Sequence, residues 1–143
     1  MLLILRLLAS DDFFANHRWS RGPGDGETGG TALETSLRGQ LQLIVRKNMH
    51  LRQPRAETPT EFITMGADSD FTAAAKLAVQ DMIDLLMEKA SLSRSEANRI
   101  AGIAADLHIS EVVDEKAGAY TSIAKSVLRS LPRKRRANGN SSK

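Results

Sequence analysis

The sequence predicts an α+β fold, in which a strand-rich first half is followed by a two-helix hairpin packed on a sheet. Three observations support this prediction. Apolar residues alternate with polar ones in residues 31–47, and they recur at three- and four-residue spacing in residues 71–89. The capping-box spacing from Ser93 to Glu96 then begins a second helical stretch. With 143 residues, the chain is long enough for one domain with its own core.

The first segment, residues 2–9, is apolar, but Arg6 interrupts it and Asp11 and Asp12 follow it. It is much shorter than the roughly 20 apolar residues that a membrane-spanning helix needs. A secretory signal would place positive charge ahead of its apolar stretch. We therefore expect a core strand or a poorly ordered start, no membrane span and a cytoplasmic protein. The absence of cysteine fits a reducing compartment and excludes a disulfide scaffold and a cysteine nucleophile.

A glycine-rich loop is expected next, because residues 22–30 contain five glycines and one proline. Residues 31–47 then predict one long strand, or two strands broken near Gly39. Two short strands should follow, on either side of Pro59, because this residue forbids an unbroken central strand. Their expected ranges are 55–58 and 61–65.

The two helices are predicted from apolar periodicity and from capping residues. Residues 68–70 offer N-caps for a helix that reaches about Lys89. The second helix should begin after Ser93 and end near Asp106, with an alanine-rich face that allows close packing. Only a few residues separate the two helices, so they should form an antiparallel or strongly angled hairpin over one face of the sheet.

A strand is expected after the second helix, around Leu107 and Ile109 and as far as Val113. His108 would then face away from both of its neighbours, and a structural role is favoured for it. A loop through Gly118 should follow. The last expected element is a short amphipathic piece with Ile123, Val127 and Leu128.

The end of the chain differs in charge from the rest. Residues 125–143 contain seven Lys/Arg and no Asp/Glu, whereas residues 1–124 carry 13 basic and 17 acidic residues. Nucleic acid is therefore not an expected partner of the folded part, and only the basic cluster at residues 133–136 could bind a polyanion. We divide the chain into an unassigned segment 1–23, a folded region 24–131 and a disordered basic tail 132–143.

The densest carboxylate cluster is Gly24-Asp25-Gly26-Glu27. Its glycines let backbone amides and a ligand come close, so Asp25 and Glu27 could bind a cation, or one of them could act on a water molecule. The pattern by itself favours a plain Asp-Gly loop. No pair of histidines has the four-residue spacing of a helical zinc motif, and no Gly-x-Ser-x-Gly sequence supports a hydrolase triad.

Arg55 and Glu57 form a second pair of charged residues, two positions apart on a predicted strand. They would share a face of that strand and could pair with each other or with a partner strand. On this spacing alone, a structural role is favoured.

Several motifs occur in order between Gly24 and Leu128, and together they indicate a family. Through this region the chain resembles the C-terminal part of the acetamidase/formamidase family, metal-dependent amidases that hydrolyse short linear amides. The motifs are Gly24-Asp25-Gly26-Glu27, Gly30-Thr31, Pro54-Arg55-Ala56-Glu57-Thr58-Pro59, Phe62-Ile63-Thr64-Met65-Gly66, Asp81 to Leu86, Leu92-Ser93-Arg94 and Ala105 to Asp114.

The resemblance implies hydrolysis of formamide or acetamide to the carboxylic acid and ammonia. It also implies a divalent metal, expected to be zinc, that polarises the amide carbonyl or activates water. Asp25 and Glu27 would be metal ligands, and Glu27 and Glu57 would be catalytic carboxylates. The expected partners are a small-molecule amide substrate and further copies of the chain.

The alternative is a non-catalytic fragment or subunit that associates with other chains. It is motivated by the greater length of family members, whose missing portion would leave sheet edges exposed. Two imidazoles of the family are also absent. Ser20 stands at one of these positions, and Tyr120 stands at the other.

Overall fold

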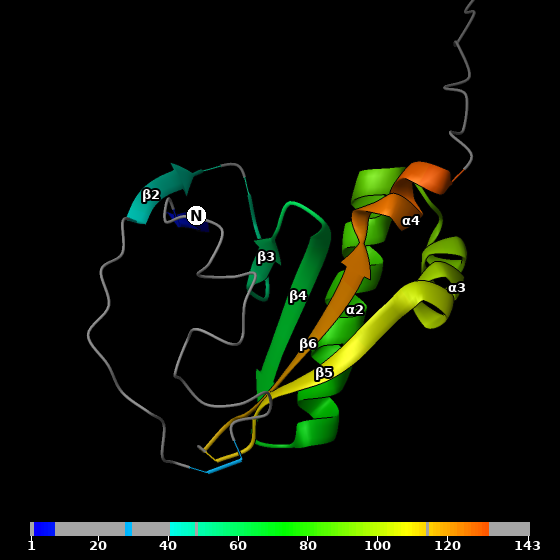
Figure 1. The fold of residues 1–143 in the computed structure, drawn as a ribbon. Coiled ribbons are helices and arrows are strands. Elements are labelled where there is room, and N and C mark those ends of the chain that lie inside the picture. Colours follow the sequence, from blue (N-terminus) through cyan, green and yellow to red (C-terminus); the bar gives the residue numbers. More distant parts are fainter. Residues whose placement is uncertain (1, 8–27, 30–40, 48, 114, 132–143) are drawn as a thin grey trace, which may run out of the picture.

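The computed structural model describes residues 2–7, 28–29, 41–47, 49–113 and 115–131 (Figure 1). It has the predicted α+β class, with an antiparallel four-stranded sheet and one long helix along a face of that sheet. The helices and strands are β1 (Leu2–Leu7), β2 (Leu41–Arg46), β3 (Arg55–Glu57), β4 (Glu61–Asp68), α2 (Phe71–Ala90), α3 (Arg94–Ala104), β5 (Ala105–Glu111), β6 (Ala117–Ala124) and α4 (Lys125–Ser130).

The sheet has the strand order β3-β4-β6-β5. Strands β4 and β6 pair along their whole length, from Glu61 opposite Ala124 to Asp68 opposite Ala117. Strand β5 forms one edge and has an irregular register after Ile109. Strand β3 forms the other edge and pairs with β4 through only three residues. The two edges therefore differ greatly in the length of their pairing.

The hydrophobic core lies between helix α2, helix α3 and the central strand β6. Successive residues of a strand point to opposite faces, so alternate residues of β4 and β6 face α2. Helix α3 contributes two alanines to this core, which confirms the close packing expected of its alanine-rich face. The cluster of buried residues is Met82, Ile83, Leu85, Leu86, Ala97, Ala101 and Ile123.

Gly66 allows helix α2 to lie unusually close to strand β4. A Cβ atom at this position would lie 2.2 Å from the carbonyl oxygen of Ala74 and 2.7 Å from the backbone nitrogen of Ala78. Both atoms belong to the backbone of the helix, so neither can move by changing a rotamer. The close approach also lets the hydroxyl of Thr64 donate a hydrogen bond of 2.8 Å to the carbonyl of Ala78.

The predicted helix caps are present. The Asp70 side chain accepts a hydrogen bond of 2.7 Å from the backbone nitrogen of Ala73, and Ser93 and Glu96 form the reciprocal capping box. Helix α2 ends before Ser91, which has a left-handed backbone with φ of 53°. Helix α3 ends at Ala104, slightly earlier than predicted, because the chain continues directly into β5.

One element differs in type from the sequence prediction. Residues 117–124 form the central strand β6, where we expected a loop through Gly118 and an amphipathic piece that included Ile123. The strand consists largely of small residues, which allow helix α2 to pack closely over it. For this reason it shows no clear alternation of apolar and polar residues. The amphipathic piece is limited to helix α4, which contains Val127 and Leu128.

Strands β1 and β2 form a separate antiparallel pair, from Leu2 opposite Arg46 to Leu7 opposite Leu41. They confirm a strand at the N-terminus and in the second part of residues 31–47. The expected break near Gly39 and the basic tail 132–143 lie outside the described residues. Among the helices that the structure describes, none is long and apolar enough to cross a membrane.

Two buried threonines under helix α2 should respond oppositely to the same substitution. Thr64 donates to Ala78, whereas the hydroxyl of Thr121 has no hydrogen-bond partner in the described part of the chain. Thr121→Val should raise the free energy of unfolding by about 1 kcal/mol, because it removes a buried unpartnered hydroxyl and keeps the side-chain shape. Thr64→Val should lower it by about 1 kcal/mol. Urea denaturation followed by circular dichroism measures both, and equal losses in the two variants would contradict this prediction.

Candidate functional site

The structure describes one of the three predicted site residues. Asp25 and Glu27 lie outside the described residues. Glu57 is the last residue of β3 and lies opposite Phe62 of β4. Its side chain is 56% exposed, and one carboxylate oxygen accepts a hydrogen bond of 2.6 Å from Nζ of Lys125. Water therefore reaches the Glu57 carboxylate, although the ammonium of Lys125 is bound to it.

The partner of Glu57 comes from the far end of the described chain. Lys125 is the first residue of helix α4, and its ammonium lies 5.0 Å from the centre of the Phe62 ring. The ammonium of Lys89, in helix α2, lies 5.6 Å from the same ring. An ammonium near an aromatic face is attracted to the electron-rich ring. The Glu57–Lys125 pair thus connects the edge strand β3 to α4, and a catalytic role for Glu57 would require this pair to open.

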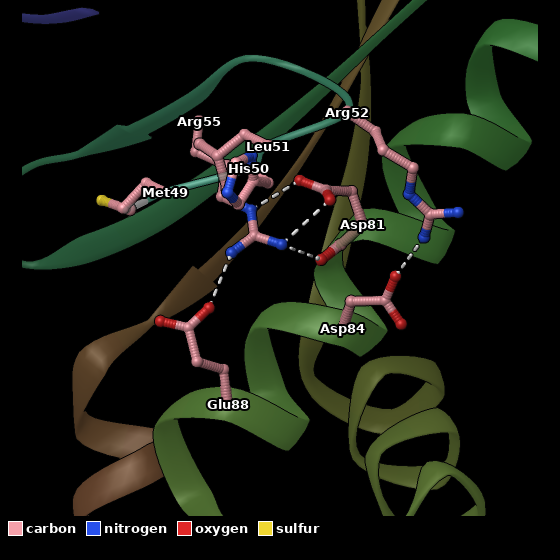
Figure 2. A pocket seen from close by; sticks show the side chains of 8 residues that line it. All are labelled: Met49, His50, Leu51, Arg52, Arg55, Asp81, Asp84 and Glu88. Carbon is pink, nitrogen blue, oxygen red and sulfur yellow. Dashed lines mark hydrogen bonds and ion pairs between the residues drawn. The ribbon is translucent and has the colours of Figure 1, made fainter. Parts of the chain in front are cut away.

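Arg55 has a different partner, on helix α2 (Figure 2). Its Nε donates to Oδ2 of Asp81 at 2.7 Å, and its Nη2 donates to Oδ1 of the same carboxylate at 2.9 Å. A third donor, Nη1, lies 3.1 Å from Oε2 of Glu88. The side chains of Arg55 and Asp81 are only 14% and 6% exposed. This bidentate ion pair between Arg55 and Asp81 is therefore largely shielded from water and salt.

The charge state of Arg55 is stabilised by its surroundings. Its hydrogen bond to Asp81 raises the pKa of Arg55, and this effect outweighs burial, which acts in the opposite direction. Because the folded-state pKa is raised, the pair contributes its full stabilisation below the ordinary pKa of arginine. The guanidinium contribution would be lost only in strong alkali. This side of the pair therefore does not titrate near neutral pH.

Asp84 joins two segments of the chain that are distant in sequence. Its Oδ2 accepts a hydrogen bond of 2.6 Å from Nη2 of Arg52, which precedes β3. Its Oδ1 accepts one of 2.9 Å from Nη1 of Arg94, at the start of α3. The two arginine side chains are 77% and 60% exposed, so these interactions are open to solvent and weak.

A hollow of about 360 Å³ lies between the segment that precedes β3 and the carboxylate-bearing face of α2 (Figure 2). Each carboxylate on this face has a guanidinium partner, so the charges in and around the hollow are balanced. No group of three or more acidic, histidine or cysteine side chains among the described residues could hold a metal ion. The lining residues are Met49, His50, Leu51, Arg52, Arg55, Asp81, Asp84 and Glu88.

We did not predict from the sequence that the carboxylates of α2 would be the partners of the arginines. Asp81, Asp84 and Glu88 have three- and four-residue spacing within a predicted helix, which places them on one face. That signal was available, but it does not reveal which cations approach the face. Arg55 and Glu57 share a face of β3 as expected, yet they pair with helices α2 and α4 instead of each other or a partner strand.

His108 lies on strand β5 opposite Tyr120 of β6, on the sheet face away from α2. Its ring stacks on that of Tyr120, with the ring centres 4.6 Å apart and the planes inclined by 9°. The arrangement agrees with the expected orientation of His108 relative to Leu107 and Ile109. This stacking supports the packing of the sheet.

The fold and the site define an α+β domain whose short edge strand is tied to two helices by ion pairs. No protein-family model and no curated protein matches the chain. Two solved structures match 76% of it at 28% identity: a predicted acetamidase/formamidase from Thermoanaerobacter tengcongensis with a TM-score of 0.68, and an acetamidase from Bacillus halodurans with a TM-score of 0.61. The predicted resemblance to acetamidases and formamidases is therefore confirmed.

An acetamidase from Yersinia enterocolitica shares the fold, with a TM-score of 0.70 and 24% identity over 74% of the chain. The chain spans only about a third of these proteins: 36% of the first, 37% of the second and 32% of the third.

Proposed function

We propose that the chain is part of an amidohydrolase that converts formamide or acetamide, with one water molecule, to the carboxylic acid and ammonia. The observation that carries this proposal is the structural match to two proteins named acetamidase or acetamidase/formamidase. The ordered motifs from Gly24 onward provide further support. We also infer a cytoplasmic location and self-association of the chain, which both stay predictions.

The proposed chemistry assigns separate tasks to the carboxylates. A carboxylate that accepts a proton from water makes the water a better nucleophile, and Glu27 and Glu57 are proposed for this step. Exposure of the Glu57 side chain supports the assignment, because solvent reaches its oxygens. For Glu57 to act as a base, Lys125 would have to move away from its carboxylate.

Zinc is proposed as the cofactor, with Asp25 and Glu27 as its ligands. A bound zinc ion would polarise the amide carbonyl. The described residues do not form a metal centre, so this assignment depends on the sequence motif alone. Two oxygen ligands would leave most of the coordination to water, and catalytic zinc sites normally have three protein ligands. We therefore expect the chain alone to show little or no turnover.

The test of the proposed function is ammonia release from formamide and acetamide by the purified chain, with and without added zinc. Zinc-dependent release that is lost in Glu57→Gln and kept in Glu115→Gln would support the proposal and the role of Glu57. Glu115 is a suitable control because it is an exposed carboxylate in the loop before β6. Absence of ammonia under all conditions would agree with the little or no turnover that two zinc ligands lead us to expect. It would remove the proposed activity from the chain alone and leave its resemblance to acetamidases unchanged.

The ligand assignment can be tested without turnover. Asp25→Asn combined with Glu27→Gln keeps side-chain size and removes both charges. We expect weaker zinc binding by calorimetry and an almost unchanged melting temperature, because the two residues belong to a glycine-rich stretch of sequence that predicts a solvated turn. Asp106→Asn, on the exposed edge of β5, is the matched control. Unchanged zinc affinity would contradict the metal assignment, and a large fall in melting temperature would identify the acids as structural.

A further inference from the structure

The segment that precedes strand β3 is attached to helix α2 by charged side chains. Among the described residues, every hydrogen bond and ion pair between residues 49–57 and α2 comes from Arg52 or Arg55. The apolar side chains of Met49 and Leu51 do not belong to the set that packs against the hydrophobic core. Apolar burial in this core therefore does not anchor the segment.

The two attachment points differ strongly in their exposure to solvent. The outer pair joins Arg52, which is 77% exposed, to Asp84. The inner pair joins Arg55 to Asp81, and both of these side chains are nearly buried. Salt screens exposed charges much more effectively than buried ones. The outer pair should therefore open under conditions in which the inner pair remains closed.

A backbone hydrogen bond strengthens the inner end of the segment. The backbone nitrogen of Met65, in β4, donates to the carbonyl oxygen of Pro54 at 3.1 Å. Strand pairing of β3 with β4 begins at the next residue, Arg55. The segment is thus attached firmly at Pro54 and Arg55, whereas Arg52 provides the only ionic contact to α2 from residues 49–54 in the described part of the chain.

We propose that residues 49–54 form a strap, hinged at Pro54 and Arg55 and closed by the Arg52–Asp84 pair, over the hollow on helix α2. The hollow lies beneath the strap, with Leu51 and Arg52 on one side and Asp84 and Glu88 on the other (Figure 2). Opening the outer pair lets the half-buried side chain of Leu51 move away from this face of α2 and into solvent. The Arg55–Asp81 pair keeps β3 in the sheet while this happens.

The strap can be followed with a single introduced thiol, because the chain contains no cysteine. Leu51→Cys places the thiol on the half-buried strap. Its alkylation by iodoacetamide, a neutral reagent, should become about two- to fivefold faster when salt is raised from about 0.01 M to about 1 M. Lys116→Cys, in an exposed loop, reports any effect of salt on the reagent itself.

Two arginine variants distinguish the strap from general loosening of the fold. In the Leu51→Cys background, Arg52→Gln should give rapid alkylation at low salt and remove the salt response. Arg94→Gln is the matched control, because Arg94 binds the same carboxylate from helix α3, and it should keep the salt response. Circular dichroism verifies that each variant is folded. An alkylation rate that responds neither to salt nor to Arg52→Gln would overturn the proposal.

The position of the hinge has its own test, by hydrogen exchange. The backbone amide of Met65 donates a hydrogen bond to the carbonyl oxygen of Pro54. Its hydrogen-exchange rate should be the same at low and at high salt, because the Arg55–Asp81 pair is shielded from solvent. If this amide lost its protection at high salt while alkylation of Leu51→Cys became faster, β3 would be separating from β4 together with residues 49–54. That result would overturn the hinge at Pro54 and Arg55.

Discussion

Replacing Gly66 by alanine should lower the free energy of unfolding by about 3 kcal/mol, the largest loss that we expect from adding one methyl group to this fold. The new Cβ would lie 2.2 Å from the carbonyl oxygen of Ala74 and 2.7 Å from the nitrogen of Ala78. These are backbone atoms in the first half of helix α2, so the helix itself must move away from β4. That movement would also lengthen the hydrogen bond from Thr64 to Ala78.

Gly102→Ala is the matched control for this prediction. Gly102 lies within helix α3, and a Cβ there would meet nothing within 4 Å. Alanine favours a helix interior over glycine by about 1 kcal/mol, so this variant should be slightly more stable than the natural chain. Urea denaturation followed by circular dichroism measures both variants. A Gly66→Ala variant as stable as Gly102→Ala would show that α2 is not held against β4 by close packing.

Asp81→Asn should lower the free energy of unfolding by about 3 kcal/mol, because it leaves the nearly buried guanidinium of Arg55 without its main counter-charge. Glu88 still lies 3.1 Å from Arg55, which places the expected loss at the lower end of the range for a broken buried pair. Thermal and urea unfolding give the measurement. Asp84→Asn, which disrupts two exposed pairs, should cost no more than about 1 kcal/mol.

The cause of the Asp81→Asn loss can be isolated by removing both charges. Arg55→Met combined with Asp81→Leu replaces the pair with apolar groups of similar volume, and it should recover most of the stability that Asp81→Asn loses. Recovery would show that the loss comes from the unpaired cation. If Asp81→Asn instead costs no more than Asp84→Asn, the Arg55–Asp81 pair is not shielded from solvent, contrary to the low exposure of its two side chains.

The elements that the sequence predicted well are those whose signals lie within a few residues. Asp70 and the Ser93–Glu96 capping box mark the starts of the helices, since a cap acts on backbone groups of the adjacent turn. Pro59 separates β3 from β4 because proline cannot donate to a sheet ladder. Each of these features depends on local chemistry, and so a linear sequence is enough to show it.

Strand β6 shows where local signals were insufficient. Its residues, Ala117–Ala124, are mostly small, and they have no polar and apolar alternation of the kind that an exposed strand shows. Their conformation is stabilised by pairing with β4 on one side and β5 on the other. Strand β5 directly precedes β6 in the chain, but helices α2 and α3 and strand β5 separate β4 from β6. The pattern of the segment itself could therefore not reveal its central position.

The sequence by itself determined the α+β class and the face shared by Arg55 and Glu57, because these follow from the two-residue and 3.6-residue periods of strands and helices. The spacing of Asp81, Asp84 and Glu88 also places them on one helix face, but we did not predict a site from it. Only the tertiary structure decided their partners. Arg55 pairs with Asp81, 26 residues away, and Glu57 pairs with Lys125, 68 residues away. A charged side chain can pair with any opposite charge that the packed fold brings within about 4 Å, and that choice is made by how α2 and α4 pack against the edge strand.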